Sequence, residues 1–138
     1  MKKYISLSED ETKKIAESIA KNTKSNIFAL TGKLGAGKTI FVQGFAKGLG
    51  ITEKITSPTF VLIHQHKIPK SSKILYHIDL YRLENLQDIN NLGLEEIISN
   101  PNNIVLIEWA KKLKKLPKTT VRITFEKTKE NTRAITFL

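Results

Sequence analysis

Apolar positions along this chain follow first a helical and then a strand period, and this change defines its elements. One helical stripe follows a capping box at residues 8–11, and a second begins at Lys38 and ends near Gly48 and Gly50. The apolar members of the two stripes are Ile15, Ala16, Ile19 and Ala20, and then Phe41, Phe45 and Leu49. The pattern therefore predicts two amphipathic helices in the N-terminal part of the chain.

Apolar runs of strand length separate and follow these helices. Strands are predicted at residues 26–30, 60–66, 74–79, 103–108, 121–125 and 133–137. The second and third runs flank a polar turn and are expected to form a hairpin, whereas the last two alternate apolar and polar residues, as an antiparallel pair with one solvated face does. Residues 83–98 mix turn and helix signals, with Leu94, Ile97 and Ile98 on the apolar side.

Residues 32–39, Gly-Lys-Leu-Gly-Ala-Gly-Lys-Thr, match the phosphate-loop pattern G-x-x-x-x-G-K-[ST] between a predicted strand and a predicted helix. The glycines let successive N–H groups turn toward phosphate oxygens. Lys38 reaches the β- and γ-phosphates, and the Thr39 hydroxyl can ligate a bridging Mg²⁺. We therefore predict ATP or ADP with Mg²⁺ as ligands, contacted by Gly32, Leu34, Gly35, Ala36, Gly37, Lys38, Thr39 and Ile40.

The order of elements predicts an α/β fold, a single P-loop NTPase domain over residues 1–138. We expect three layers, with a mixed, mainly parallel central sheet and antiparallel peripheral strands. A chain of 138 residues leaves little room for a lid or a substrate-recognition domain, which suggests a helper protein that acts on something held by a partner.

Composition limits the partners and the compartment. The net charge of +10 favours polyanionic partners, such as nucleic acid or an acidic protein surface. Without cysteine, disulfides and thiolate metal sites are excluded. The N-terminus carries Lys2 and Lys3 but no apolar stretch of the kind found in secretion signals, and no apolar run approaches the roughly 18 residues of a membrane helix. We therefore expect a cytoplasmic protein without a membrane partner, and we expect no DNA partner.

Two predicted strands end in acids, Asp79 and Glu108, at the edge where open α/β sheets bind ligands. Each can hold Mg²⁺ directly or through a water molecule, and Glu108 can also polarise the attacking water. The sequence does not choose between them as the direct ligand. His77 shares a strand face with Asp79, two residues away, and is a candidate for supporting these acids.

Two further residues are candidates by position. Thr59 lies in the Ser-Pro-Thr-Phe segment between the phosphate-loop helix and the next strand, where nucleotide switches place a loop that senses the γ-phosphate. Trp109 directly follows Glu108 and can stack on a base or on a partner at the edge of the site.

Taken together, these segments resemble the TsaE ATPases of bacterial tRNA modification. The matching pieces are residues 32–39, Ser-Pro-Thr-Phe at 57–60, His-Ile-Asp-Leu-Tyr-Arg-Leu at 77–83 and Ile-Glu-Trp at 107–109, in the order and at the spacing of that family. The resemblance covers essentially the whole chain. Two positions depart from the family pattern: Ile40 stands where a second Thr is usual, and Ala110 where a Pro is frequent.

The resemblance implies a weak ATPase that assists threonylcarbamoyl transfer to the adenosine next to the anticodon, in tRNAs that read codons starting with A. Such proteins act with TsaD and TsaB, TsaD performs the transfer, and tRNA is met indirectly or through the complex. By this resemblance, residues 35–38 would bind the phosphates, and Thr39, Glu108 and Asp79 would bind Mg²⁺. Thr59 would sense which nucleotide is bound. Trp109 would lie at the partner-facing rim, and adenine contacts would come from Thr12 and Arg133.

Two other classes of function stay open from the residues alone. A small-molecule kinase would need a lid with arginines over the phosphates, and the chain has only Arg82, Arg122 and Arg133, widely separated. A non-catalytic module that senses nucleotide or binds RNA through its basic surface would bind without turnover.

Overall fold

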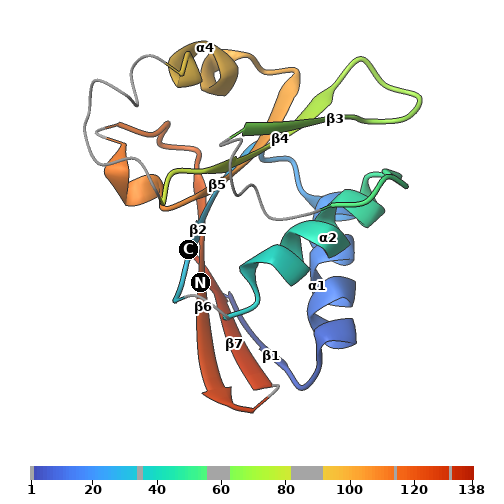
Figure 1. The fold of residues 1–138 in the computed structure, drawn as a ribbon, viewed down its shortest axis with the longest axis vertical. Coiled ribbons are helices and arrows are strands. Elements are labelled where there is room, and N and C mark those ends of the chain that lie inside the picture. Colours follow the sequence, from blue (N-terminus) through green and yellow to red (C-terminus); the bar gives the residue numbers. More distant parts are fainter. Residues whose placement is uncertain (1, 34–35, 56–62, 82–91, 114, 131) are drawn as a thin grey trace.

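The computed structural model describes residues 2–33, 36–55, 63–81, 92–113, 115–130 and 132–138. The elements in chain order are β1 (Lys2–Ser6), α1 (Glu9–Asn22), β2 (Ile27–Thr31), α2 (Lys38–Gly48), β3 (Ile63–Lys67), β4 (Ile74–Asp79), α4 (Leu94–Ser99), β5 (Asn103–Glu108), the 3₁₀ helix η1 (Ala110–Lys112), β6 (Val121–Lys129) and β7 (Thr132–Phe137). Among the described residues, seven strands form one sheet in the order β1-β7-β6-β2-β5-β4-β3 (Figure 1).

The sheet is parallel at its centre and antiparallel at its edges. Strand β2 pairs in parallel with β5 and β6, and β4 pairs in parallel with β5. The antiparallel pairs are β3 with β4, β6 with β7, and β1 with β7. This confirms the predicted mixed sheet, the hairpin and the terminal pair.

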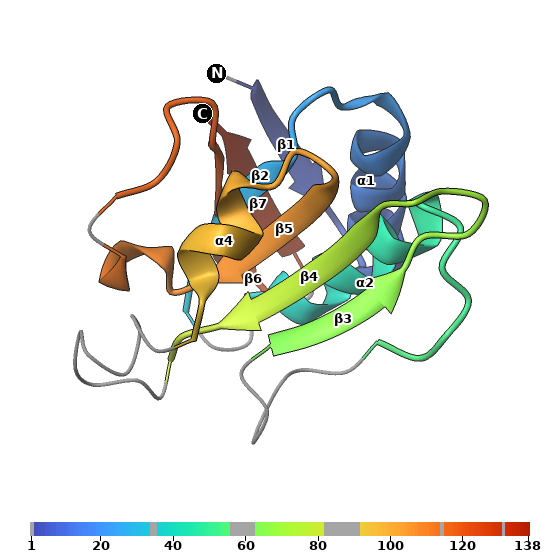
Figure 2. The ribbon, with the colours of Figure 1, turned by 90° about the horizontal axis from the view of Figure 1, so that it is seen from above.

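Helices cover both faces of this sheet, so the three predicted layers are present. Helices α1 and α2 lie on one face, and α4 and η1 lie on the other (Figures 1 and 2). Along β2, Phe28 packs in the same apolar cluster as Phe41 and Phe45 of α2, whereas its neighbours Ile27 and Ala29 pack in the cluster beneath α4. Successive side chains of β2 thus pack into two apolar cores, one on each face of the sheet. Full burial of each large side chain stabilises the fold by about 1.5–3 kcal/mol.

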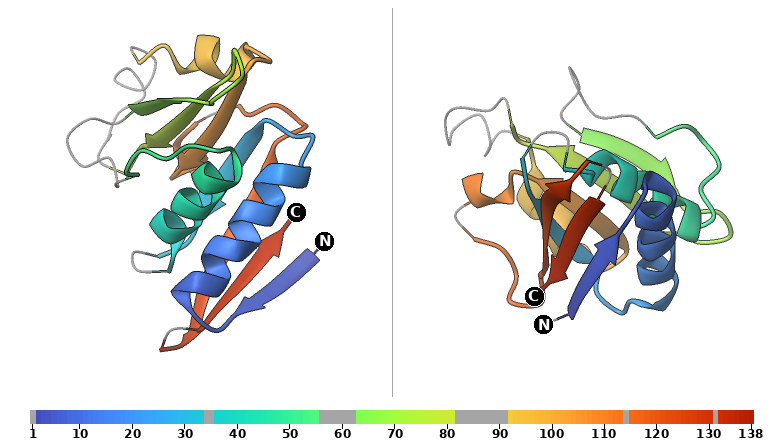
Figure 3. Two further views of the ribbon diagram at one scale, coloured as in Figure 1. Left: turned by 90° about the vertical axis from the view of Figure 1, so that its right-hand side faces the viewer. Right: turned by 90° about the horizontal axis from the view of Figure 1, so that it is seen from below.

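Helix α1 begins at the predicted cap, with one change in the bonding. The Ser8 hydroxyl accepts the N–H of Glu11 at 3.1 Å, but the Glu11 carboxylate accepts the N–H of Leu7 at 3.2 Å instead of the N–H of Ser8. The helix then lies beside α2 (Figure 3). A Cβ at Gly44 of α2 would overlap the backbone of Lys13, so glycine permits this close crossing.

Some elements differ from the sequence prediction. Strand β1 was not predicted, because its lysines break the apolar pattern, yet Tyr4 packs edge-on against Phe137 at 5.4 Å between ring centroids. Strand β6 extends to Lys129, beyond the predicted end at residue 125. Residues 60–62 of one predicted strand, and residues 83–91 of the mixed segment, lie outside the described residues. The described helices are all too short or too polar to span a lipid bilayer.

Candidate nucleotide-binding site

The predicted phosphate loop connects β2 to α2, as the motif requires. Helix α2 starts at Lys38, and Gly37 before it has φ of 99°, a left-handed conformation that glycine adopts without strain. The side chain of Arg133 from β7 passes close by, with Nε 3.6 Å from the position a Cβ on Gly37 would occupy. The positive end of the α2 dipole therefore faces the loop, next to a further cation.

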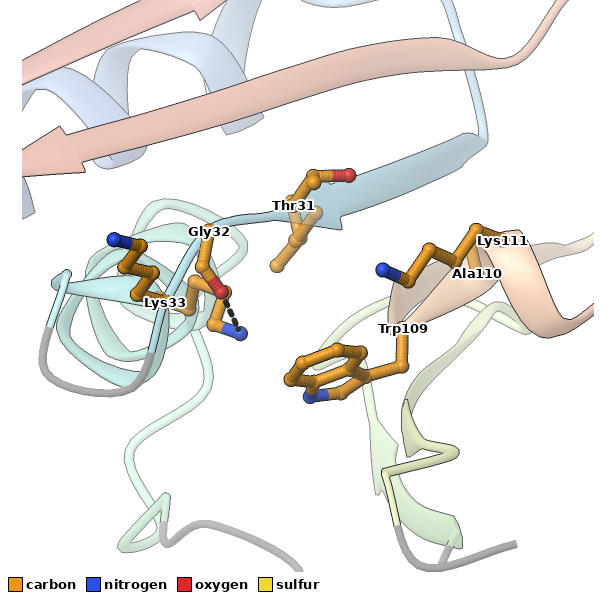
Figure 4. Close-up of a pocket in the computed structure, with 8 residues that line it drawn as sticks. Thr31, Gly32, Lys33, Trp109, Ala110 and Lys111 are labelled. Atoms are coloured by element: carbon orange, nitrogen blue, oxygen red, sulfur yellow. Dashed lines mark hydrogen bonds between the residues drawn. The ribbon is translucent and has the colours of Figure 1, made fainter. Parts of the chain in front are cut away.

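Lys38 is buried and already engaged within the loop. Its ammonium donates to the carbonyl of Gly32 at 2.7 Å, drawn as the dashed line in Figure 4, and lies 3.8 Å from the Glu108 carboxylate. Only 6% of the Lys38 side chain is exposed. Because a buried ammonium is costly without partners, these contacts hold the lysine at the loop and leave it able to exchange the carbonyl for phosphate oxygens.

The two acids named from the sequence lie side by side. Strands β4 and β5 are parallel neighbours whose last residues, Asp79 and Glu108, are directly paired. Glu108 is almost fully buried, and its second oxygen lies 2.6 Å from Nε2 of His77, which is fully buried. Glu108 thus sits between a lysine of the phosphate loop and a histidine of β4.

Asp79 is more exposed than Glu108, and its surroundings shift the pKa of its carboxyl. Burial raises the pKa of its carboxyl above the ordinary value, the N–H of Tyr81 bonded to it at 2.9 Å acts to lower it, and the nearby charge of Glu108 raises it again. Two neighbouring carboxylates of this kind favour a cation between or beside them.

The available ligands fit a magnesium ion that also binds phosphate. Mg²⁺ prefers hard oxygen ligands, and Thr39, Asp79 and Glu108 supply hydroxyl and carboxylate oxygens around the start of α2. Within the described residues, no group of three or more His, Asp and Glu side chains forms a complete metal site. Water molecules or nucleotide oxygens would complete the coordination of an ion held here.

Trp109 covers the lysine of the loop. The chain turns sharply after β5, where Trp109 has φ of 61° and ψ of 36°, an uncommon left-handed conformation for a bulky residue. The turn places Lys38 Nζ 5.0 Å from the centroid of the indole, and Lys111 Nζ lies 5.2 Å from that centroid. Tyr81 packs against Trp109 with 4.9 Å between ring centroids and 45° between the ring planes. The indole thus joins the end of β5 to the phosphate loop.

A cavity of about 240 Å³ opens between the phosphate loop and η1 (Figure 4). Three cationic side chains line it, Lys33, Lys38 and Lys111, together with Trp109. Such a lining favours an anionic ligand. Sequence reasoning did not single out Lys33, Lys111 or Tyr81. The sequence pattern could have pointed to Tyr81 as a site residue, because Tyr81 and Trp109 follow the acids at the ends of adjacent parallel strands.

The predicted site residues fall into three groups. Gly32, Ala36, Gly37, Lys38, Thr39, Ile40, Asp79, Glu108, Trp109 and Arg133 lie at the loop, in the first turn of α2 or around them. Thr12 lies in α1, 2% exposed, with its hydroxyl 2.6 Å from that of Ser6. Leu34, Gly35 and Thr59 lie outside the described residues. The ligand contacts assigned to all of these residues remain predictions.

Comparisons with known proteins match the chain to one family. The model of the family described as "Threonylcarbamoyl adenosine biosynthesis protein TsaE" matches residues 6–135. The chain is similar to the tRNA threonylcarbamoyladenosine biosynthesis protein TsaE of Bacillus subtilis, with 38% identity over 98% of this chain and 84% of that protein. The protein of the same name from Treponema pallidum is 40% identical over 82% of each chain.

Two further matches concern length and fold. The TsaE protein of Rickettsia conorii is 44% identical over 79% of this chain, and the match spans 61% of that longer protein. A crystal structure of Bacillus subtilis YdiB superposes with a TM-score of 0.80 at 34% identity, covering 99% of this chain and 83% of that one.

Proposed function

The chain belongs to the TsaE family of tRNA threonylcarbamoyladenosine biosynthesis proteins, and from this premise we propose that it binds and hydrolyses ATP in that pathway. The observation that carries the proposal is the contact between Lys38 of the phosphate loop and Glu108 of the adjacent strand, at 3.8 Å. A phosphate loop beside a buried acid at the carboxyl end of the neighbouring strand is the arrangement that nucleotide hydrolysis uses.

Each residue then has a defined task. The loop N–H groups and Lys38 hold the β- and γ-phosphates, and the dipole of α2 adds to their field. When bound, Mg²⁺ would neutralise charge that develops on the phosphate oxygens, with Thr39 and Glu108 as its protein ligands and Asp79 linking this region to the switch segment. Glu108 also orients water, and Arg133, beside Gly37, contacts the nucleotide on the other side of the loop.

We propose that hydrolysis serves a complex rather than this chain alone. TsaD and TsaB are the proposed partners, and the modified base is the adenosine next to the anticodon in tRNAs that read codons starting with A. Turnover is expected to be weak in isolation. In the proposal a partner orders a switch around Thr59, so without the partner the state that can hydrolyse ATP is sparsely populated. Trp109 and the half-exposed Tyr81 beside it form a surface suited to such a partner. A cytoplasmic location follows from the tRNA substrate of the proposal.

The decisive experiment measures ATP hydrolysis by the purified chain with and without TsaD and TsaB, together with the threonylcarbamoyladenosine content of tRNA modified by the reconstituted set. We expect low turnover alone, higher turnover with both partners, and modification over many cycles only when this chain is present. Thr59→Ala should reduce the stimulated rate more than nucleotide affinity.

Each of three other results would contradict the proposal and indicate a different function. Transfer of the γ-phosphate to a small acceptor would indicate a kinase. Nucleotide binding without turnover under any of these conditions would indicate a sensor. RNA binding that weakens steeply with salt and does not depend on ATP would indicate an RNA-binding module.

A further inference from the structure

His77 is a buried polar residue whose bonding is directed at the site. Its side chain is fully buried, and on β4 it lies on the same sheet face as Asp79, two residues away. Pairing of Asp79 with Glu108 puts all three side chains on one face, above the start of α2. Nε2 of His77 lies 2.6 Å from Oε2 of Glu108, which is a short, charge-assisted hydrogen bond.

We propose that His77 is a positioning residue for Glu108: it holds Oε2 and leaves Oε1 as the oxygen that serves the nucleotide. This inference rests on the proposed hydrolysis of ATP. Oε1 faces Lys38 Nζ at 3.8 Å, whereas Oε2 is bonded to the histidine. The two oxygens of one carboxylate thus have different partners, one from the sheet and one from the phosphate loop.

The bonding also defines the position of the imidazole proton. An ionised Glu108 only accepts hydrogen bonds, so Nε2 of His77 must carry the proton. Nδ1 is buried without a hydrogen-bond partner among the described residues. A second proton on Nδ1 would be an unpaired buried donor, which is more costly than an unpaired buried lone pair. The geometry therefore corresponds to an imidazole with its proton on Nε2.

Fixing the carboxylate matters because Glu108 is buried and short of other donors. A carboxylate at 4% exposure that is held at one oxygen cannot rotate freely, so its second oxygen keeps one direction. Removal of a residue that hydrogen-bonds to a metal-binding or catalytic acid typically lowers activity or metal affinity by about 10- to 100-fold. We expect an effect of this size on turnover, with little effect on nucleotide affinity, which rests on the loop.

The same sheet face offers a matched control. His66 of β3 also forms a short bond to a glutamate, with 2.6 Å between Nδ1 and Oε1 of Glu53, and its Nε2 is likewise buried without a hydrogen-bond partner. Glu53 is largely exposed and lies in the loop after α2, away from the phosphate loop. Removing this second pair tests the loss of a buried histidine bond without touching Glu108.

The experiment compares the single variants His77→Leu, His77→Gln, His66→Leu and Glu108→Ala, and one double variant, in the complex that gives ATP turnover. We expect His77→Leu to lower kcat about 10- to 100-fold with KM nearly unchanged. Gln places an N–H donor near the position of Nε2 and should restore most of kcat. His66→Leu should leave kcat unchanged. The double variant His77→Leu with Glu108→Ala should be no slower than Glu108→Ala alone, because His77 acts through Glu108.

A second measurement needs neither nucleotide nor turnover. Nitrogen-15 NMR of the imidazoles in the nucleotide-free wild-type protein should show His77 with its proton on Nε2, and Glu108→Ala should change the His77 signals while leaving those of His66 in place. A proton on Nδ1 alone, or normal kcat in a folded His77→Leu protein whose Glu108→Ala counterpart is inactive, would overturn the inference only. Normal turnover in Glu108→Ala would instead overturn the hydrolytic role of Glu108, and this inference with it.

Discussion

The indole of Trp109 lies over the ammonium group of Lys38, with 5.0 Å between Nζ and the ring centroid. The contact joins the residue after Glu108, the last residue of β5, to the first residue of α2. It is held by a left-handed backbone at Trp109, a conformation that costs about 1–2 kcal/mol for most residues. A ligand that draws Lys38 toward its phosphates must therefore alter the surroundings of the indole.

Trp109 should report nucleotide binding directly, because it is the only tryptophan in the chain. We expect its fluorescence to change when ATP or ADP binds, and to change less with AMP, which lacks the phosphates that Lys38 reaches. Titrations followed by fluorescence and by calorimetry should give the same dissociation constant. If calorimetry detects binding while the emission stays constant, the indole does not respond to the loop.

Lys38→Ala should abolish hydrolysis and weaken triphosphate binding. Loss of one charge-assisted contact costs about 1.5–3 kcal/mol, or roughly 10- to 100-fold in affinity. Calorimetry with a non-hydrolysable ATP analogue and a steady-state assay measure the two effects. Lys21→Ala is the matched control, since it removes a lysine paired with Glu17 on the exposed side of α1. Normal turnover in a folded Lys38→Ala protein would contradict the assignment of the loop.

Glu108→Ala should separate binding from turnover. Nucleotide affinity rests on the loop and is expected to change only modestly, whereas hydrolysis at saturating ATP should fall by about 100- to 10,000-fold, the range for removal of a group that activates water. Pre-steady-state binding and steady-state hydrolysis distinguish the two. A collapse of affinity with a normal rate at saturation would make Glu108 a binding residue only.

The sequence predicted the elements whose signals are local. Strands β4 and β5 begin and end at the predicted residues, because each is a short apolar run closed by an acid. The phosphate loop and α2 followed from spacing that has a mechanical reason. Strand β1 escaped prediction because its lysines are exposed and its pairing with β7 depends on residues at the other end of the chain.

The site was predicted as a set of residues but not as a set of contacts. The register between β4 and β5 places Asp79 beside Glu108, and the turn at Trp109 places the indole over the ammonium group of Lys38. Neither follows from spacing along one segment. The bond from His77 to Glu108 likewise depends on the parallel pairing of strands that are separated by α4 in the chain.

Asp79→Asn should stabilise the nucleotide-free protein against unfolding near neutral pH. Burial, together with the charge of Glu108, raises the pKa of Asp79 in the folded state, so a cost in stability builds up as the pH rises above the unfolded pKa and is complete above the folded pKa. Below the unfolded value the carboxyl is protonated in both states, and the cost disappears. Asn keeps an acceptor for the N–H of Tyr81, bonded at 2.9 Å in the wild type.

Thermal unfolding of wild-type and Asp79→Asn proteins across acidic to neutral pH measures this difference. The melting temperature of the variant should exceed that of the wild type near pH 7, and the two should converge as the pH falls through the acidic range. A wild-type advantage at neutral pH without nucleotide would contradict the electrostatic argument.

Strand β1 pairs with β7 and forms one edge of the sheet, although most of the described elements separate the two strands in the sequence. Lys2 lies opposite Phe137, and both ends of the chain emerge at the same place (Figure 2). During synthesis from the N-terminus, β1 has no partner until residues 132–137 of β7 have been made, so this pairing is highly non-local. Pairing of β1 with β7 therefore follows synthesis of the intervening strands and helices, and dyes attached to β1 and β7 would time it.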